Sequence, residues 1–496
     1  MPMLRWIALA VFAALAAIHV AICVAGSAPT NDDAFISFRY SRNLVEGHGL
    51  VFNVGERVEG YTNFLWVLLV AAAMKVTDAV LAAKVMGVLC NVVTIGLVLR
   101  LSLRVAGGAW WLAPLMLALD PSFATWSTRG LETSLFALLA FAAFATAGGD
   151  EPRDPQRAAN LAVLATLARP EGLLVAMACG LGWFRRAPLR LVAFSATYVA
   201  LLVPYLAWKL WYYGSVLPNT YYAKTGGGVF QAWRGLSYVT NGWSFVPLLF
   251  CIGIAGALFL RRGEPRPPVL VAAATVLGCF LAYVIQVGGD SLGKDRFLAP
   301  LAPFLFLATA VAVRRLGASR AWALIVLVLV LFVRDLAPLL DVVKNPNVWS
   351  RAKEAAEVHT RLGLCLKEHA RPGASIATSL IGRVPFYSGL KTIDKLGLID
   401  PHIAHMGATG SGAAGHEKFD PDYVLSLRPT YILGGKVGEV IVAPPPEKRW
   451  VRWLRQHVSG DPPQPEKRSM KPEEHGYVLA TIPCEPRPAQ VWELSP

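Results

Sequence analysis

Long apolar segments separated by short polar connections make up the first two thirds of the chain. The first runs from Trp6 to Ala25 with His19 as its only polar side chain, and about 20 such residues cross the roughly 30 Å hydrocarbon layer as a helix. Val24–Ala28 offers small residues to a signal peptidase, but the run is longer than a signal core, so we predict a retained helix. Ten further apolar segments follow, which predicts about eleven transmembrane helices; they are residues 81–103, 108–120, 131–147, 158–169, 171–184, 189–210, 243–260, 268–286, 297–313 and 320–338.

Residues 64–79 form a shorter apolar segment that does not fit this series. A further crossing here would invert every later connection, whereas an interfacial or re-entrant helix leaves their order intact. We therefore predict that this segment is embedded in the outer leaflet without crossing the membrane.

Arginines gather in alternate connections between the predicted helices. Because positive residues favour the cytoplasmic side, these connections are predicted to be cytoplasmic. An odd number of crossings then places the N-terminus inside, and places the first loop and everything beyond about residue 340 outside. The arginines concerned are Arg100, Arg104, Arg153, Arg157, Arg185, Arg186, Arg190, Arg261, Arg262, Arg266, Arg314, Arg315 and Arg320.

The polarity of the chain changes near residue 340, which predicts two domains. Residues 1–340 form a transmembrane domain with 26–80 as its first outer loop, and residues 341–496 are long enough for one soluble domain outside the membrane. In the second domain we predict a helix at about 350–369, and the fold class is α/β or α+β. Short strands are predicted at 375–378, 431–433 and 476–480.

Composition agrees with a multi-pass membrane protein. Of the 496 residues, 55% are hydrophobic and 16% are charged, and the mean hydropathy is +0.46; both fractions depart from the soluble average. The net charge is +14, of which +11 belongs to residues 1–340, with 27 Lys and Arg against 16 Asp and Glu. Much of that excess is topology-setting arginine, so the basic charge does not indicate a nucleic-acid partner.

The seven cysteines form neither a zinc-binding spacing nor a disulfide framework. Five lie in apolar segments, where a small buried side chain is the ordinary interpretation, while Cys365 and Cys484 lie in the second domain. If that domain is exported, a disulfide between these two is chemically feasible, although their spacing does not show that they are near each other.

The loop after the first helix carries the most distinctive chemistry. Asp32 and Asp33 are adjacent, and Arg39 follows among aromatic residues. Paired carboxylates supply a general base beside a second anion, an arginine can neutralise a phosphate, and aromatic rings offer flat faces to a sugar or an isoprenoid chain. An ordinary solvated loop is the alternative, because an Asp-Asp pair alone is common.

Further ionisable residues lie in the connections predicted to face outward. Such groups are costly near membrane depth unless they are paired or bind a ligand. Mutual salt bridges of Arg129 with Glu132 and of Arg169 with Glu171 are one interpretation. We expect Arg39, Lys224 and Arg296 to be the stronger candidates for binding an anionic lipid phosphate.

Taken in order, these motifs resemble bacterial membrane glycosyltransferases of the GT-C fold, and most closely the terminal β-(1→2)-arabinofuranosyltransferase-like family. The resemblance spans nearly the whole chain, and the first loop and the order of the motifs are its specific parts. The glycine-rich stretch 288–296 departs from the family, in which a shorter bridge links Gly-Gly-Asp to Arg-Phe. The matching segments are Asp32–Tyr40, Asn43–Asn53, Glu59–Asn63, Gly130–Thr133, Arg169–Gly172, Leu217–Thr220, Gly289–Asp290 with Arg296–Leu298, and Ile393–Pro401.

The resemblance implies transfer of a single sugar, arabinofuranose or a related pentose, from a polyprenyl-phosphate donor. The acceptor would be a cell-envelope glycan or protein on the outer face of the cytoplasmic membrane, with inversion or retention left open. An acid of the first outer loop works at the reacting centre in such enzymes, which maps onto Asp32 and Asp33. We expect donor and substrate binding to involve Arg39, Tyr40, Glu59, Tyr61, Asn63, Arg129, Glu132, Arg169, Glu171, Asn219, Tyr222, Lys224, Asp290 and Arg296.

The expected reaction needs no nucleotide or ATP, because a polyprenyl phosphate is already a good leaving group and no phosphate-cradling glycine loop is present. A divalent metal beside Asp32 and Asp33 is an option that the reaction does not require. The second domain is expected either to position the acceptor, with Asp394, Asp400 and His402 toward the membrane, or to act as a stabilising cap.

Two other functions stay open at this point. A lipid-linked sugar flippase or transporter would also need many crossings and intramembrane charges, although the two-fold internal repeat typical of transporters is not seen. A ligase that moves a larger oligosaccharide differs only in the size of its donor.

Overall fold

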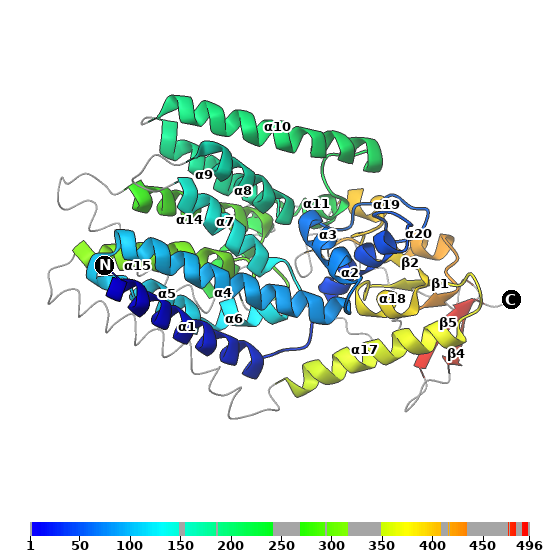
Figure 1. Ribbon diagram of the computed structural model, residues 1–496. Coiled ribbons are helices and arrows are strands. Elements are labelled where there is room, and N and C mark those ends of the chain that lie inside the picture. The colour runs from blue at the N-terminus through cyan, green and yellow to red at the C-terminus, as the bar shows by residue number, and fades with distance from the viewer. Residues whose placement is uncertain are drawn as a thin grey trace.

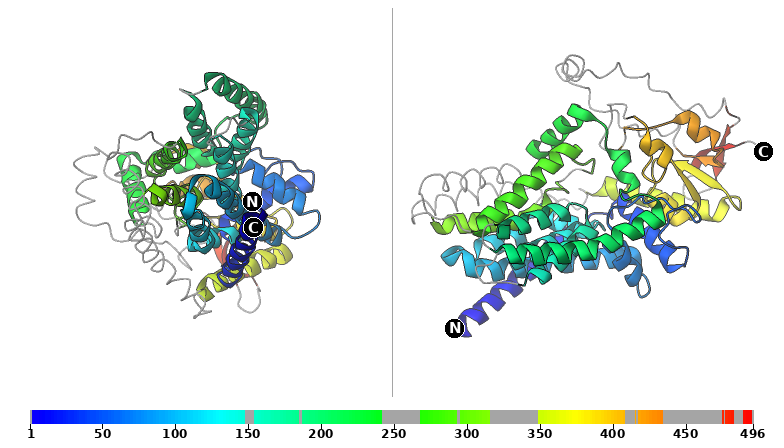
Figure 2. Two further views of the ribbon diagram at one scale, coloured as in Figure 1. Left: turned by 60° about the vertical axis from the view of Figure 1, so that its left-hand side comes forward. Right: turned by 90° about the horizontal axis from the view of Figure 1, so that it is seen from above.

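The computed structural model describes residues 2–147, 154–184, 187–241, 268–292, 295–315, 349–407, 415, 417–433, 475, 477–482 and 489–494. An elongated bundle of helices carries an α/β domain at one end, and the N-terminus lies at the other (Figure 1). Figure 2 shows the same arrangement from two further sides.

Helices occupy every predicted transmembrane segment that falls within the described residues. Four of them are long and apolar enough to cross a membrane, Arg5–Ala25, Ala79–Val105, Pro188–Tyr213 and Val269–Val287, so the prediction of a multi-pass membrane protein is confirmed. The predicted segments 243–260 and 320–338 lie outside the described residues, and the number eleven stays a prediction. The bundle helices are α1 (Pro2–Ala25), α4 (Ala79–Val105), α5 (Leu112–Leu119), α6 (Pro121–Thr128), α7 (Thr133–Ala147), α8 (Pro155–Ala168), α9 (Gly172–Phe184), α10 (Pro188–Tyr213), α12 (Gly228–Asn241), α14 (Pro268–Val287) and α15 (Ala302–Arg315), with short 3₁₀ turns at Gly107–Ala109 and Ala299–Leu301.

The apolar segment that did not fit the series forms a short helix, α3 (Phe64–Ala73). Ten residues span about 15 Å, roughly half of the hydrocarbon layer, so α3 is too short to cross by itself. Trp66, Val67 and Val70 on this helix are fully buried. The segment is therefore packed into the protein beside α2 (Asp32–Val45), as Figure 1 shows.

His19, the polar residue in the first helix, has buried partners. Its Nδ1 lies 2.8 Å from the carbonyl oxygen of Ala118, and its Nε2 lies 3.0 Å from the amide nitrogen of Asn91. Because the Asn91 amide can only donate, Nε2 accepts and Nδ1 carries the proton, which makes the imidazole neutral. The hydrogen bonds offset the cost of burying this group and fasten α1 to α4 and α5.

The second domain is built on a five-stranded mixed sheet in the order β2-β1-β3-β5-β4. β1 pairs in parallel with β2 and with β3, whereas β5 runs antiparallel to both β3 and β4. Its strands are β1 (Ser375–Thr378), β2 (Lys391–Asp394), β3 (Tyr431–Ile432), β4 (Tyr477–Ile482) and β5 (Ala489–Leu494), and its helices are α17 (Ser350–His369), α18 (Arg383–Ser388), α19 (Pro401–His405) and α20 (Pro421–Ser426). The predicted helix and strands at 350–369, 375–378 and 431–433 are confirmed, and β4 begins one residue after its predicted start; β2 and β5 were not predicted.

The sheet is buried on both faces at β1 and β3, because successive residues of a strand point to opposite sides. Ile376 of β1 packs with Leu366 of α17 and Val384 of α18. Its neighbour Ala377 faces the other side, together with Ile403 of α19 and Val424 of α20. The domain is therefore a three-layer structure with helices on both faces of the sheet.

The two domains meet along α2, where side chains of the first loop bind backbone groups of the second domain. The carboxylate of Asp32 accepts hydrogen bonds from the backbone amides of Gly382 and Arg383 at 3.1 and 2.9 Å. Asn53 exchanges two hydrogen bonds with the backbone of Thr392, at 2.9 and 2.8 Å. The first loop and the second domain consequently form one continuous structure on the same side of the bundle.

Gly382→Ala is expected to loosen this junction. A Cβ at Gly382 would lie 2.0 Å from the carbonyl oxygen of Asp32 and 2.5 Å from its carboxylate. The segments that carry Gly382 and Asp32 would therefore have to move apart. Losing two hydrogen bonds to a carboxylate costs about 1.5–3 kcal/mol each, and we expect a lower thermal unfolding temperature of the purified protein. Gly407→Ala, where the added Cβ meets nothing within 4 Å, is the matched control; equal unfolding temperatures for both variants would contradict the prediction.

Candidate active site

The two aspartates open α2, and they face different surroundings. Asn31 caps the helix by accepting a hydrogen bond from the backbone amide of Asp33 at 3.0 Å. The first turn is the positive end of the helix dipole, which favours carboxylates there. The carboxylate of Asp32 accepts the hydrogen bonds from the backbone amides of Gly382 and Arg383 described above. Burial raises the pKa of this carboxyl, and the two amides offset the rise in part. Asp33 is half-buried, and its carboxylate has no hydrogen bond or ion pair with any residue that the structure describes.

A buried network of polar and charged side chains lies beside α2. Arg169, between α8 and α9, forms ion pairs with Glu132 at 2.9 Å and with Glu171 at 2.6 Å. Asn63 donates a hydrogen bond to the other carboxylate oxygen of Glu132 at 2.8 Å and bonds to Ser37 of α2. All five residues are no more than 5% exposed. The salt bridge expected between Arg169 and Glu171 is present, whereas Glu132 pairs with Arg169 and not with Arg129.

Arg296 and Asp290 extend this network, despite the unusual length of the stretch between them. Their side chains are less than 10% exposed and form an ion pair at 2.6 Å. Burial by itself would lower the pKa of Arg296, but the carboxylates of Asp290, Glu132 and Asp33 raise it above the ordinary value. Asp33 is therefore close enough to the network to interact with it. Lys294, in the same stretch, lies outside the described residues.

The guanidinium of Arg39 is occupied by backbone carbonyls, so Arg39 is not among the residues that we propose for phosphate binding. Its guanidinium donates to three backbone carbonyls, those of Phe52 at 2.8 Å, Pro385 at 2.6 Å and Leu390 at 2.7 Å, and it is 6% exposed. Sequence alone suggested a phosphate ligand here. The side chain instead joins α2 to the second domain.

The aromatic and amide residues of the candidate set mostly shape the first loop. The hydroxyl of Tyr40 donates to the carbonyl of Val58 at 2.6 Å and accepts from the amide of Gly60 at 2.8 Å. The hydroxyl of Tyr61 lies 3.0 Å from that of Tyr213 in α10. Asn219 lies at the start of α11 (Asn219–Lys224), and its side-chain amide donates to the carbonyl of Gly397 at 2.8 Å. The backbone amide of Asn219 donates to the backbone carbonyl of Glu59 at 2.9 Å. Tyr222 stacks on His405 with ring centroids 4.3 Å apart.

Glu59 forms a buried ion pair that was not predicted. Its carboxylate lies 2.8 Å from the ammonium of Lys209, and both side chains are at most 6% exposed. Lys209 lies near the end of α10, and an ionisable residue in so apolar a helix was the available signal. Burial raises the pKa of Glu59 to about 7, although Lys209 lowers it in part.

This pair predicts a pH dependence of stability. Between the ordinary pKa of 4.5 and the folded value of about 7, the folded protein keeps a proton that the unfolded chain has lost. The contribution of Glu59 to stability is therefore full below about pH 4.5 and is lost as the pH rises through 7. We expect the unfolding temperature to fall less between about pH 5 and pH 8 in Glu59→Gln than in the parent. Parallel pH profiles of the two proteins would contradict this.

Arg129 and Lys224 lack a carboxylate partner among the described residues, as Arg39 does. The guanidinium of Arg129 lies 5.3 Å from the ring of Trp126 and 5.1 Å from that of Trp349. Its Nε is buried and has no hydrogen-bond partner in the described part of the chain. Its backbone carbonyl accepts from the amide of Asn31 at 3.0 Å, which places it beside the start of α2. Burial lowers the pKa of Arg129, and a desolvated cation of this kind favours an anionic ligand.

The acids and the histidine suggested for the second domain have partners within it. The carboxylate of Asp394 is buried and accepts from the backbone amides of Leu396 and Ile399, at 2.8 and 3.0 Å. Asp400 caps α19 at the amide of Ile403, and His402 pairs with Asp420 at 3.1 Å. Cys365 is disulfide-bonded, and Cys484 lies outside the described residues. No group of three or more His, Cys, Asp or Glu within the described residues could hold a metal ion.

Solved structures identify the fold. Two crystal structures of ArnT from Cupriavidus metallidurans align with this chain. The structure in the apo state has a TM-score of 0.55 and 14% identity, and the alignment covers 86% of this chain and 91% of ArnT. The structure bound to undecaprenyl phosphate has a TM-score of 0.52 and 13% identity, and the alignment covers 79% of this chain and 86% of ArnT. The chain therefore has the GT-C membrane fold that was predicted.

Curated relatives point to one family. The chain is 27% identical over 326 residues to the terminal β-(1→2)-arabinofuranosyltransferase of Mycobacterium tuberculosis, covering 54% of this chain and 50% of the relative. It is 29% identical over 358 residues to the protein of the same name from Corynebacterium glutamicum, covering 60% and 50%. The predicted resemblance is confirmed, and the match spans about half the length of these relatives. A family model described as "Domain of unknown function (DUF8728)" matches residues 347–474.

Proposed function

We propose that this protein is a membrane glycosyltransferase that moves one sugar from a polyprenyl-phosphate donor to a hydroxyl of a cell-envelope glycan or protein. Three findings support it: the names of the curated relatives, the shared fold with ArnT, and the undecaprenyl phosphate bound in one ArnT structure. The names of the relatives favour arabinofuranose or a related pentose as the sugar. The observation that carries the proposal is the carboxylate of Asp33, which has no hydrogen bond or ion pair with any described residue, in a helix whose start contacts the backbone of Arg129.

In the proposed reaction, the acceptor oxygen bonds to the anomeric carbon while the bond from that carbon to the phosphate oxygen breaks. The carboxylate of Asp33 takes the proton of the acceptor hydroxyl, and the polyprenyl phosphate leaves with the electron pair. Positive charge develops on the sugar ring and negative charge returns to the phosphate, so an acid at one end and cations at the other lower the barrier. No metal is part of this proposal.

We propose that Arg129 and Lys224, two of the cations predicted to bind donor or substrate, hold the phosphate. Arg169, Arg296 and Lys209 are neutralised by carboxylates, whereas a phosphate bound by Arg129 would supply the anion that this side chain lacks. Lys224 is half-buried against Gly415 and has no ion pair within the described part of the chain. The paired charges would then hold the loops that carry Asp33 in place.

We propose that the site faces the periplasm or exterior of the cytoplasmic membrane. The alternating arginines support this orientation. Direct contact of Asp32 with Gly382 and Arg383 means that the first loop and the second domain share one side. An acceptor in the envelope would therefore reach Asp33 and the second domain together.

The purified protein in lipid nanodiscs, given a labelled polyprenyl-phosphoryl arabinofuranose and an arabinan acceptor, tests the proposal. We expect label in the acceptor and free polyprenyl phosphate in equal amounts, without nucleotide. A parallel set with other polyprenyl-phosphoryl sugars identifies the donor sugar. Movement of intact donor across vesicle membranes without bond cleavage would contradict the proposal and indicate a transporter.

A further inference from the structure

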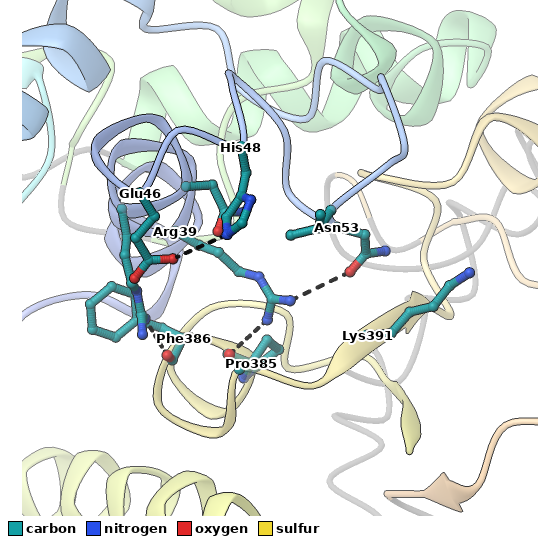
Figure 3. Close-up of a pocket in the computed structure, with 11 residues that line it drawn as sticks. Arg39, Glu46, His48, Asn53, Pro385, Phe386 and Lys391 are labelled. Atoms are coloured by element: carbon teal, nitrogen blue, oxygen red, sulfur yellow. Dashed lines mark hydrogen bonds and ion pairs between the residues drawn. The ribbon is translucent and has the colours of Figure 1, made fainter. Parts of the chain in front are cut away.

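A cavity of about 300 Å³ opens at the other end of α2, between the first loop and the second domain. Residues 39–54 form one wall and residues 385–391 the other. Figure 3 shows Arg39, His48 and Asn53 on one side and Phe386 and Lys391 on the other. The cavity is at the lower end of the volume range of small-molecule sites and far larger than one water molecule requires.

Arg42 is the key side chain of this cavity. Its guanidinium lies 3.7 Å from the centre of the Phe386 ring and donates to the carbonyl of the same residue. Its Nε is buried and has no hydrogen-bond partner among the residues that the structure describes. Burial lowers the pKa of Arg42, and Glu46 offsets this in part. An anion in the cavity that this residue lines would reduce the cost of desolvating its charge.

The lining carries an excess of positive charge. The lining contains three cationic side chains, those of Arg39, Arg42 and Lys391, and one carboxylate, that of Glu46. The side chain of Glu46 is half-exposed and lies 3.9 Å from His48. The side chain of Lys391 is 59% exposed, and its ammonium pairs with Glu56 at 2.7 Å on the surface. Since exposed pairs of this kind contribute little, Lys391 is free to turn toward an anion in the cavity.

We propose that this cavity binds an acidic sugar unit of the acceptor polymer, one that carries a carboxylate or a phosphate. The positive lining accounts for the charge of the ligand, and the aromatic ring of Phe386 suits the face of a sugar. The inference rests on the proposed glycosyl transfer, because it is the acceptor of that reaction that would occupy this face.

The position of the cavity fits a remote unit of the acceptor better than the reacting hydroxyl. Arg42 lies nine positions after Asp33 in α2, a rise of about 13.5 Å along the helix. One wall belongs to the same helix as Asp33, and the other belongs to the second domain. Binding a distant unit of the acceptor here would orient the acceptor chain along α2. The binding energy of that unit would then help to position the reacting end.

Direct binding to the purified full-length protein in nanodiscs tests the inference. The probes are methyl glucuronoside for the carboxylate, glucose 1-phosphate for the phosphate and methyl glucoside as the neutral sugar, followed by calorimetry or saturation-transfer NMR. We expect one or both acidic probes to bind and the neutral sugar to bind at least about tenfold more weakly. The stronger acidic probe identifies the anionic group.

Arg42→Gln and Lys391→Gln are expected to weaken binding of the acidic probe by about tenfold or more each. Arg57→Gln is the matched control, because this exposed arginine lies over Tyr212, outside the cavity. Lys391→Gln removes only an exposed pair, so it tests the site even if Arg42→Gln fails to fold. Equal affinity for neutral and acidic probes, or unchanged affinity in Lys391→Gln and a folded Arg42→Gln, would overturn the inference.

Transfer kinetics separate this inference from the proposed function. With an acidic acceptor polymer, Lys391→Gln is expected to raise KM by about tenfold and to leave kcat unchanged. A parent protein that transfers sugar but binds no acidic probe would overturn the cavity assignment alone. A parent protein that binds the acidic probe in this cavity but transfers no sugar would overturn the proposed function alone.

Discussion

Asp33→Asn is expected to lower the rate of sugar transfer by about 10²- to 10⁴-fold, the usual contribution of a positioned general base. The amide keeps the size of the carboxylate but cannot take the proton of the acceptor hydroxyl. Because the Asp33 carboxylate has no hydrogen bond or ion pair with other described residues, the variant should express and unfold like the parent. Initial rates in the nanodisc assay, together with unfolding temperatures, measure both effects.

Asp32→Asn is the matched control for this prediction. Its carboxylate serves the junction with Gly382 and Arg383, so we expect a lower unfolding temperature and a much smaller loss of transfer than for Asp33→Asn. A stable Asp33→Asn protein that keeps most of its activity, or an Asp32→Asn protein that is silenced without any loss of stability, would contradict the assignment of the two acids.

Arg169→Met is expected to reduce stability by about 3–5 kcal/mol, the usual cost of removing one partner of a buried ion pair. The change leaves Glu132 and Glu171 buried without their cation. We expect little folded protein after extraction and a much lower unfolding temperature, measured by tryptophan fluorescence and by size-exclusion profile. Arg157→Met, at an exposed position in the same part of the chain, should behave like the parent.

A triple variant distinguishes lost pairing from lost packing. If uncompensated charge is the cause, Arg169→Met combined with Glu132→Gln and Glu171→Gln should recover a large part of the stability. Unchanged stability in Arg169→Met, or no recovery in the triple variant, would contradict the energetic role of this network.

Periodicity and hydrophobicity were sufficient to predict the helical bundle, because each helix is specified by a contiguous stretch of sequence. They also predicted α17 and β1 of the second domain. The strands β2 and β5 were missed, because packing against neighbouring strands decides whether a segment joins a sheet more than its local sequence does. The eight-residue helix α6 was missed for a related reason, as it lies inside a connection between two apolar segments.

For the site, the sequence indicated which residues are charged, but not which of them form hydrogen bonds or ion pairs with other parts of the protein. Arg39 appeared free because its partners are backbone carbonyls, two of them more than 300 residues away. Asp32 and Asp33 looked equivalent, although adjacent residues of a helix point about 100° apart. Only the tertiary structure shows that one faces the second domain and the other the buried network. Lys209 was overlooked because its partner Glu59 lies in a distant loop.

The central claim is that Asp33, rather than Asp32, meets the reacting sugar. A structure of the full-length protein with a non-transferable polyprenyl-phosphonate sugar would test it most directly. We predict the Asp33 carboxylate within about 3.5 Å of the anomeric carbon or of the acceptor oxygen that approaches it, with the phosphonate against Arg129. A donor whose sugar lies away from Asp33, with Arg129 unoccupied, would contradict the account.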